Sequence, residues 1–401
     1  MAITAVLLGR TLGAKGFGQV SLINNTIALF GGFALFGIGT TLTTRTAQLR
    51  NSNHKLLGQT LGLGTAGLWV TGMLAGGALA ISARSIAAGL HAPELEWPIR
   101  LSALTVIFSA VLGAPVATLT GFEAFSRLTV AGVVAALLGI PLILLGAYWG
   151  GVVGTVLGYA LLAISSWMLH QWMARRHLVE RGITASFNPT AEQLRSFLSV
   201  NVPVFLSGVM NAGGVWISGV FLTMHPASYV EVGVFGAATQ WRALVLFLPA
   251  TLSQALLPVL ASSQEEPVRR AQLYESVSLL LTLVTAAVAA LAVSALAPFL
   301  MASYGQTFGG GAGALVVLGW SAVFMSAGTV IWQALLSRGV PWQAFLLAAS
   351  WFGVQTAAAF LLYGYGASGM AYANLISFGF QAALGSVLLW RLRRQSRRPA
   401  S

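Results

Sequence analysis

The chain contains no aspartate and no cysteine, and charged residues occupy only 7% of its 401 positions. The absence of cysteine excludes disulfide bonds and thiolate metal ligands. Soluble domains carry about 25% charged residues, so this scarcity of charge excludes an ordinary soluble fold. Hydrophobic residues make up 57% of the chain instead, which predicts an all-α polytopic membrane protein.

Uncharged stretches long enough to cross a bilayer follow one another along most of the chain. A transmembrane helix needs about 20 apolar residues. Single crossings are predicted for 16–44, 56–83, 101–122, 196–230 and 232–262, and two crossings each for 128–174, 276–337 and 339–390. Residues 1–9 add a short start that rises only about 14 Å as a helix. We therefore expect about twelve transmembrane helices, the first of them truncated.

The cations are unevenly divided between the gaps that separate these stretches. Sixteen of the 21 Lys and Arg residues lie in alternate gaps, four lie in the other gaps, and Arg242 lies inside a stretch. The positive-inside rule places the richer gaps and both termini in the cytoplasm. The expected organisation is an N-terminal lobe (1–174), a cytoplasmic linker (175–195), a C-terminal lobe (196–390) and a basic cytoplasmic tail (391–401) that contacts anionic membrane lipids.

The two six-helix lobes resemble each other at an offset near 215. The matching positions are Gly18 with Gly233, Leu42 with Leu257, and Ala147–Tyr148 with Gly364–Tyr365, where each half makes its last tight turn. Because six is an even number, both halves enter the membrane from the same side, which makes this a parallel repeat. Such a repeat predicts a cavity between two lobes. Gly150, Gly154 and Gly158 have the spacing of closely packed membrane helices.

Arg242 is the one cation predicted to lie deep in the membrane. A charged residue at that depth costs about 2.5–3.5 kcal/mol on insertion scales and usually faces a protein interior or a wet cavity. Every glutamate lies in a loop or at a helix end, so no predicted span supplies a carboxylate to neutralise Arg242. We interpret Arg242 as a binding point for a phosphate or pyrophosphate, which Arg grips bidentately. The structural alternative is an Arg that snorkels to the interface or bonds main-chain carbonyls.

Other polar side chains in the predicted spans suit sugar hydroxyls and rings, and suit interhelical hydrogen bonds equally well. The candidates for substrate binding are Gln240, Gln254, Asn25, Asn201 and Trp216. No histidine has metal-ligand spacing, so neither a metal nor a cofactor is expected. The net charge of +12 is scattered over short loops, which argues against nucleic acid as a partner.

Several short segments resemble the polysaccharide flippase family, in this order along nearly the whole chain. They are 8–18, 119–125, 231–238 with Pro249 and 257–260, Tyr304–Gly305, and 335–339. The resemblance implies a two-lobed bundle in the bacterial cytoplasmic (inner) membrane, alternating access, and a cationic cavity for the substrate's pyrophosphate. By position, Arg10 matches the arginine that ends the family's first helix. Arg45 matches the basic inner end of the second helix, and Arg242 a cavity cation of the eighth.

The function that these observations favour is translocation of an undecaprenyl-pyrophosphate-linked oligosaccharide across the membrane for surface polysaccharide biosynthesis. The implied partners are this lipid-linked substrate, membrane lipids, a glycan polymerase and other assembly proteins. One alternative is a small-molecule or multidrug exporter of the same superfamily, which a buried carboxylate would favour. Another is a membrane glycan polymerase or ligase, which would use catalytic residues on a large outer loop. The first hypothesis describes a transporter and not an enzyme.

Overall fold

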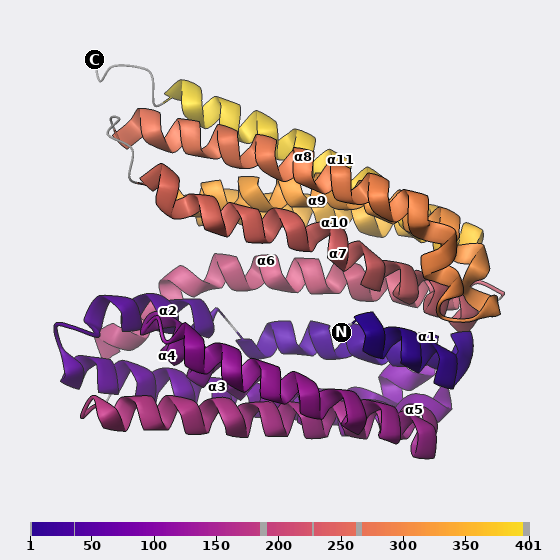
Figure 1. Ribbon diagram of the computed structural model, residues 1–401, viewed down its shortest axis with the longest axis horizontal. Coiled ribbons are helices and arrows are strands. Elements are labelled where there is room, and N and C mark those ends of the chain that lie inside the picture. Colours follow the sequence, from indigo (N-terminus) through magenta and orange to yellow (C-terminus); the bar gives the residue numbers. More distant parts are fainter. Residues whose placement is uncertain (1, 36, 185–190, 227, 262–266, 396–401) are drawn as a thin grey trace. The chain divides into compact units, whose positions relative to one another are not determined.

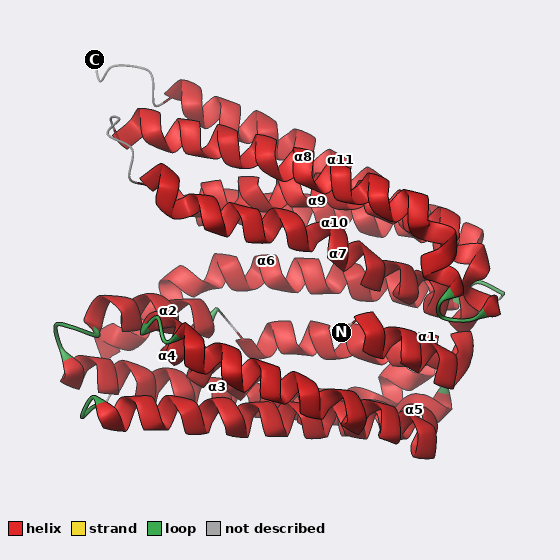
Figure 2. Ribbon diagram, in the orientation of Figure 1, coloured by secondary structure: helices red, strands yellow, loops and turns green. Residues whose placement is uncertain are grey.

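The computed structural model describes residues 2–35, 37–184, 191–226, 228–261 and 267–395. Within these ranges the chain forms helices joined by short loops, and it forms no strand (Figure 2). In chain order the α-helices are α1 (Ala2–Leu35), α2 (Ile38–Leu49), α3 (His54–Gly89), α4 (Glu96–Gly121), α5 (Phe125–Glu180), α6 (Ala191–Thr223), α7 (Ser228–Ala261), α8 (Pro267–Ala302), α9 (Ala312–Ser337), α10 (Pro341–Leu362) and α11 (Gly366–Gln395) (Figure 1). Three short 3₁₀ helices connect them: η1 (Pro93–Leu95), η2 (Gln306–Gly311) and η3 (Tyr363–Tyr365).

Seven helical segments of the described chain are long and apolar enough to cross a membrane, or eight if the bent pair α1–α2 is counted as one span. Large apolar side chains stand exposed along them, among them Ile81 (85%), Leu137 (65%) and Phe299 (73%). A bilayer would cover such surface, and it leaves each helix to satisfy its own backbone hydrogen bonds. The predicted all-α, polytopic membrane fold is therefore confirmed, while the count of twelve helices stays a prediction.

Helix α5 is two antiparallel helices and not one straight rod. Its 56 residues are interrupted at Gly151, whose φ of 54° and ψ of −131° are not helical and are readily adopted only by glycine. Beyond the break, Gly154 packs against the main chain of Gly146, and Gly158 packs against Leu142 and Ile143. The close packing predicted for Gly154 and Gly158 is thus confirmed, whereas Gly150 has open space around it.

The breaks between helices recur at a nearly constant interval, which supports the predicted parallel repeat. Four residues of the first half with positive φ have counterparts 214 to 216 positions later. The pairs are Gly13 (65°) with Ser228 (35°), His91 (54°) with Gly305 (130°), Glu123 (58°) with Gly339 (73°), and Gly151 (54°) with Gly366 (61°). The last turns therefore lie at Gly151 and Gly366, slightly beyond the predicted Ala147–Tyr148 and Gly364–Tyr365.

The described helices divide into two compact units. One unit contains residues 19–212, and the other contains residues 1–18 together with 213–401. In the first unit, α3 lies beside α4 and α4 beside α5 (Figure 1). Its core is aliphatic where α2, α3 and α4 meet, around Leu42, Leu57 and Leu68. The lobe boundaries drawn at 174 and 196 stay a prediction.

In the second unit, the start of the chain packs against α7 through glycine. A methyl group placed at Gly18 would clash with the main-chain oxygen of Tyr229 and lie 2.8 Å from the nitrogen of Gly233. A methyl group placed at Gly233 would clash with the main-chain oxygen of Ala14 and lie 3.2 Å from the nitrogen of Gly18. The two helices therefore touch backbone to backbone at positions that correspond in the repeat. Beside this crossing, Phe17 packs edge-on against Tyr304 and Phe308.

Candidate functional site

Helix α7 carries Arg242 about 20 Å along its axis from Ser228, since an α-helix rises 1.5 Å per residue. The side chain is half-buried. Its Nη1 donates a hydrogen bond to Oδ1 of Asn374 on α11, at 2.9 Å. The partner is a side-chain amide. Arg242 therefore differs from both structural alternatives, which were an Arg that snorkels to the interface and an Arg that bonds main-chain carbonyls.

Asn374 is 7% exposed and is oriented by its own helix. Its Nδ2 donates to the main-chain oxygen of Met370, one turn earlier in α11, at 2.9 Å. An amide nitrogen can donate to a carbonyl and an amide oxygen cannot, so this bond settles which end of the carboxamide faces Arg242. The oxygen is thereby left to accept from the guanidinium.

A buried chain of uncharged groups extends from Asn374 across three helices. Ser377 donates to Oε1 of Gln355 on α10 at 2.5 Å, and its hydroxyl lies 3.1 Å from the main-chain oxygen of Asn374. Nε2 of Gln355 donates to Ser218 on α6 at 2.9 Å. Gln355, Ser377 and Ser218 are at most 2% exposed. These bonds satisfy buried polar groups and hold α11 against α10 and α6 near the Arg242 contact.

The positive charge of Arg242 has no counter-ion in the described part of the chain. Among the residues that the structure describes, no carboxylate lies within ion-pair distance of it, and the ion pairs that do form lie at helix ends in the other unit. A guanidinium has five N–H donors. Asn374 takes one of these donors, and no second hydrogen-bond partner exists in the described part of the chain. The remaining donors form the fork that matches a phosphate bidentately.

Arg10 and Arg45 take no part in the hydrogen bonds described around Arg242. Arg10 is exposed, and its Nε donates to the main-chain oxygen of Ser303 at 2.7 Å, where it satisfies a carbonyl beyond the end of α8. Arg45 is exposed on α2 in the other unit, without a hydrogen-bond partner among the described residues. The substrate contacts expected of both stay predictions.

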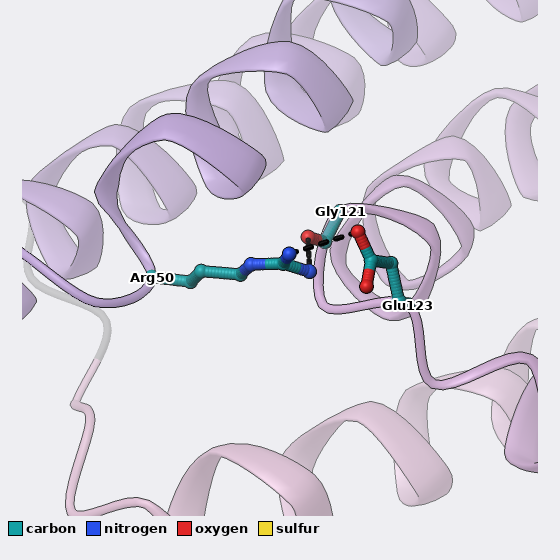
Figure 3. A network of polar contacts seen from close by, with 3 residues as sticks. All are labelled: Arg50, Gly121 and Glu123. Carbon is teal, nitrogen blue, oxygen red and sulfur yellow. Dashed lines mark hydrogen bonds and ion pairs between the residues drawn. The ribbon is translucent and has the colours of Figure 1, made fainter. Parts of the chain in front are cut away.

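The neighbouring cation Arg50 has a structural role that the sequence analysis missed. It donates from Nη1 to the main-chain oxygen of Gly121 at 3.2 Å and from Nη2 to Oε1 of Glu123 at 2.8 Å (Figure 3). The bonds join the end of α2 to the turn after α4, where Glu123 has positive φ. Arg50 is thus engaged within the protein, and Arg45 is the exposed cation of this helix.

The remaining candidates are dispersed over several helices. Gln240 is exposed on α7, Trp216 is half-buried on α6, and Asn25 is half-buried on α1. Its neighbour Asn24 has its side chain near that of Tyr159 on α5. Gln254 and Asn201 fall within helices α7 and α6, but their side chains lie outside those that the structure describes. Asn374 and Gln355 were not among the candidates, although each is an amide inside an apolar stretch.

Solved structures of transporters share this fold over nearly the whole chain. An inward-facing multidrug-resistance MATE-family transporter of the MOP superfamily superimposes with a TM-score of 0.79 at 17% identity, covering 98% of this chain and 95% of that one. A MOP-superfamily transporter from Pyrococcus furiosus, described as having a binding pocket of reverse polarity, gives 0.68 at 18% identity, with 98% and 95% covered. The chain therefore shares the fold of these solved structures.

Residues 1–264 match the family model described as "Polysaccharide biosynthesis protein", and the chain belongs to this family. A curated relative is the EPS I polysaccharide export inner membrane protein EpsE of Ralstonia nicotianae, which is 28% identical over 201 residues. The match covers 47% of this chain and 45% of that protein, so the chain spans less than half the length of this relative.

Proposed function

We propose that this protein is a flippase of the bacterial cytoplasmic membrane. It moves an undecaprenyl-pyrophosphate-linked oligosaccharide from the inner to the outer leaflet for surface polysaccharide biosynthesis, by alternating access, with both termini in the cytoplasm. The family and the fold support a polysaccharide transporter. The solved structures described as multidrug-resistance transporters share 17–18% identity with this chain, a level that supports a common fold and not a common substrate.

The observation that carries the proposal is the half-buried guanidinium of Arg242, which has one hydrogen-bond partner and no carboxylate partner among the described residues. Moving an ionised pyrophosphate through hydrocarbon is prohibitive, because an unpaired ion loses its hydration without compensation. A fixed guanidinium lowers that barrier through charge-assisted hydrogen bonds. The lipid tail then stays in the bilayer while the head group passes along the protein.

The proposed partners follow from this role. The substrate is the lipid-linked oligosaccharide, and the basic tail at 391–398 contacts anionic lipids. A glycan polymerase and other surface-polysaccharide assembly proteins would take up the translocated product.

The test is complementation of a host strain deleted for this gene. Surface polysaccharide and the amount of transporter in the membrane are measured for wild type, Arg242→Ala, Arg242→Lys and Arg84→Ala. Arg84 is an exposed cation at the end of α3 and serves as the matched control. We expect Arg242→Ala to abolish export and Arg242→Lys to retain part of it, because Lys is a point charge without the fork. Arg84→Ala is expected to export normally. Wild-type export by Arg242→Ala at normal membrane levels would remove Arg242 from the mechanism.

A further inference from the structure

Among the residues that the structure describes, Asn374 is the hydrogen-bond partner of the Arg242 guanidinium, and it has no charge of its own. A guanidinium so deep in a membrane protein would ordinarily be paired with a carboxylate, because an unpaired charge is costly there. An aspartate at 374 would have nearly the same shape as asparagine and would form such a pair. It would also cancel the charge that a phosphate needs. The neutral amide therefore gives Arg242 a fixed position without neutralising it.

Two sets of bonds fix where that amide oxygen lies. The bond from Nδ2 to the Met370 carbonyl sets the rotation of the carboxamide. The bonds from Ser377 to Gln355 and from Gln355 to Ser218 hold the same turn of α11 against α10 and α6. An acceptor held in this way limits the positions that the long Arg242 side chain can adopt. Its unpaired N–H groups are then oriented before any ligand arrives, which lowers the entropic cost of binding.

We propose that Asn374 is a positioning residue for Arg242: its buried neutral amide holds the guanidinium by one N–H and leaves the charge and the remaining N–H groups to a pyrophosphate-type anion. This inference rests on the proposed function, because it assumes that an anion binds at Arg242. It adds that the affinity is set by a group that does not itself contact the anion.

The experiment measures binding of inorganic pyrophosphate to the purified full-length protein in detergent by titration calorimetry. The variants are Asn374→Asp, Asn374→Ala, Arg242→Ala and Asn211→Asp. Asn211 is the matched control, since its Nδ2 donates to the Ser207 carbonyl one turn earlier in α6, at 2.8 Å, in the same manner as Asn374. The thermal unfolding midpoint is recorded for each variant.

We expect Asn374→Asp to weaken pyrophosphate binding about tenfold or more. Its unfolding midpoint should change little, because the new ion pair with Arg242 offsets the lost hydrogen bond from Nδ2 to the Met370 carbonyl. Asn374→Ala keeps the charge and loses the positioning contact, so its affinity falls several-fold. Asn211→Asp introduces the same carboxylate elsewhere and should bind within about twofold of wild type. A merely structural role for Asn374 predicts the opposite order, with Asp tolerated and Ala damaging.

The possible failures are distinguishable. If Arg242→Ala binds pyrophosphate as wild type does, the anion does not bind at Arg242 and the proposed function fails. If Arg242→Ala loses affinity while Asn374→Asp retains it, the proposed function stands and the positioning role is overturned. Undecaprenyl pyrophosphate is titrated in parallel. Tighter binding of this lipid supports a lipid-linked ligand, and equal affinity for both compounds would overturn the lipid assignment.

Discussion

Gly18 and Gly233 provide a quantitative test of the packing between α1 and α7. The perturbation is Gly18→Ala, Gly233→Ala and the double substitution. Each added methyl group would clash with a main-chain oxygen of the facing helix, and backbone cannot move aside as a flexible side chain can. Inserting a methyl group into such a contact costs about 1–3 kcal/mol. This exceeds the gain of about 1 kcal/mol that Gly→Ala gives within a helix.

The double substitution carries the sharper prediction. Both methyl groups are relieved by the same movement, which is separation of the two helices. Once the first has forced this movement, the second adds little. The combined loss should therefore fall short of the sum of the single losses by about 1 kcal/mol or more, which is the coupling expected of residues in contact.

The assay is thermal unfolding of the detergent-solubilised protein followed by circular dichroism. The control is Gly353→Ala on α10, where an added methyl group meets no atom within 4 Å. This control should leave stability unchanged or raise it slightly. The reasoning is refuted if either single variant behaves like Gly353→Ala, or if the losses of the two single variants simply add.

Three further predictions concern other contacts and use the same unfolding assay. Gly151→Ala should lower stability by about 1–2 kcal/mol because alanine disfavours positive φ. Gly150→Ala should leave stability unchanged, since the space around Gly150 is equally open. Equal effects of the two substitutions would contradict the backbone argument. Gln355→Leu should cost about 1–2 kcal/mol because it removes two buried hydrogen bonds, while the hydroxyls of Ser218 and Ser377 each keep a main-chain acceptor. Gln333→Leu at an exposed site on α9 should be nearly neutral. Arg50→Met should lower the free energy of unfolding by about 1 kcal/mol at low salt and by less at high salt, because it removes a partly exposed ion pair with Glu123. A loss of stability that does not depend on salt would assign the effect to packing.

The helical architecture was predictable because bilayer thickness and hydropathy leave the chain few choices. Uncharged stretches became the long helices, and the offset near 215 reappears in the breaks at Gly151 and Gly366. The break itself was harder to place. Gly150 and Gly151 are adjacent glycines, and only the path of the chain decides which of them takes the left-handed conformation.

The candidate site was predictable only in part. Arg242 stood out because a lone cation in an apolar stretch is costly. Its hydrogen-bond partner Asn374 could not be recognised in the sequence, because it lies 132 residues away. Asn24, Asn25 and Asn211 are also amides in apolar stretches, and nothing in the sequence distinguishes Asn374 from them. Which of several similar amides faces a given side chain depends on how the helices rotate against each other. Local sequence does not specify that rotation.

The recurring breaks are the pattern expected of gene duplication, and they give the offset at which the two halves can be compared. At the offset of 215, Asn374 corresponds to Tyr159, and Arg242 lies one helical turn beyond the counterpart of Asn24. Corresponding helices of the two halves thus carry polar side chains here, with Asn24 near Tyr159 in one half and Arg242 hydrogen-bonded to Asn374 in the other. Of these four side chains, only Arg242 is charged. Two halves with matching breaks are therefore chemically unequal at this place.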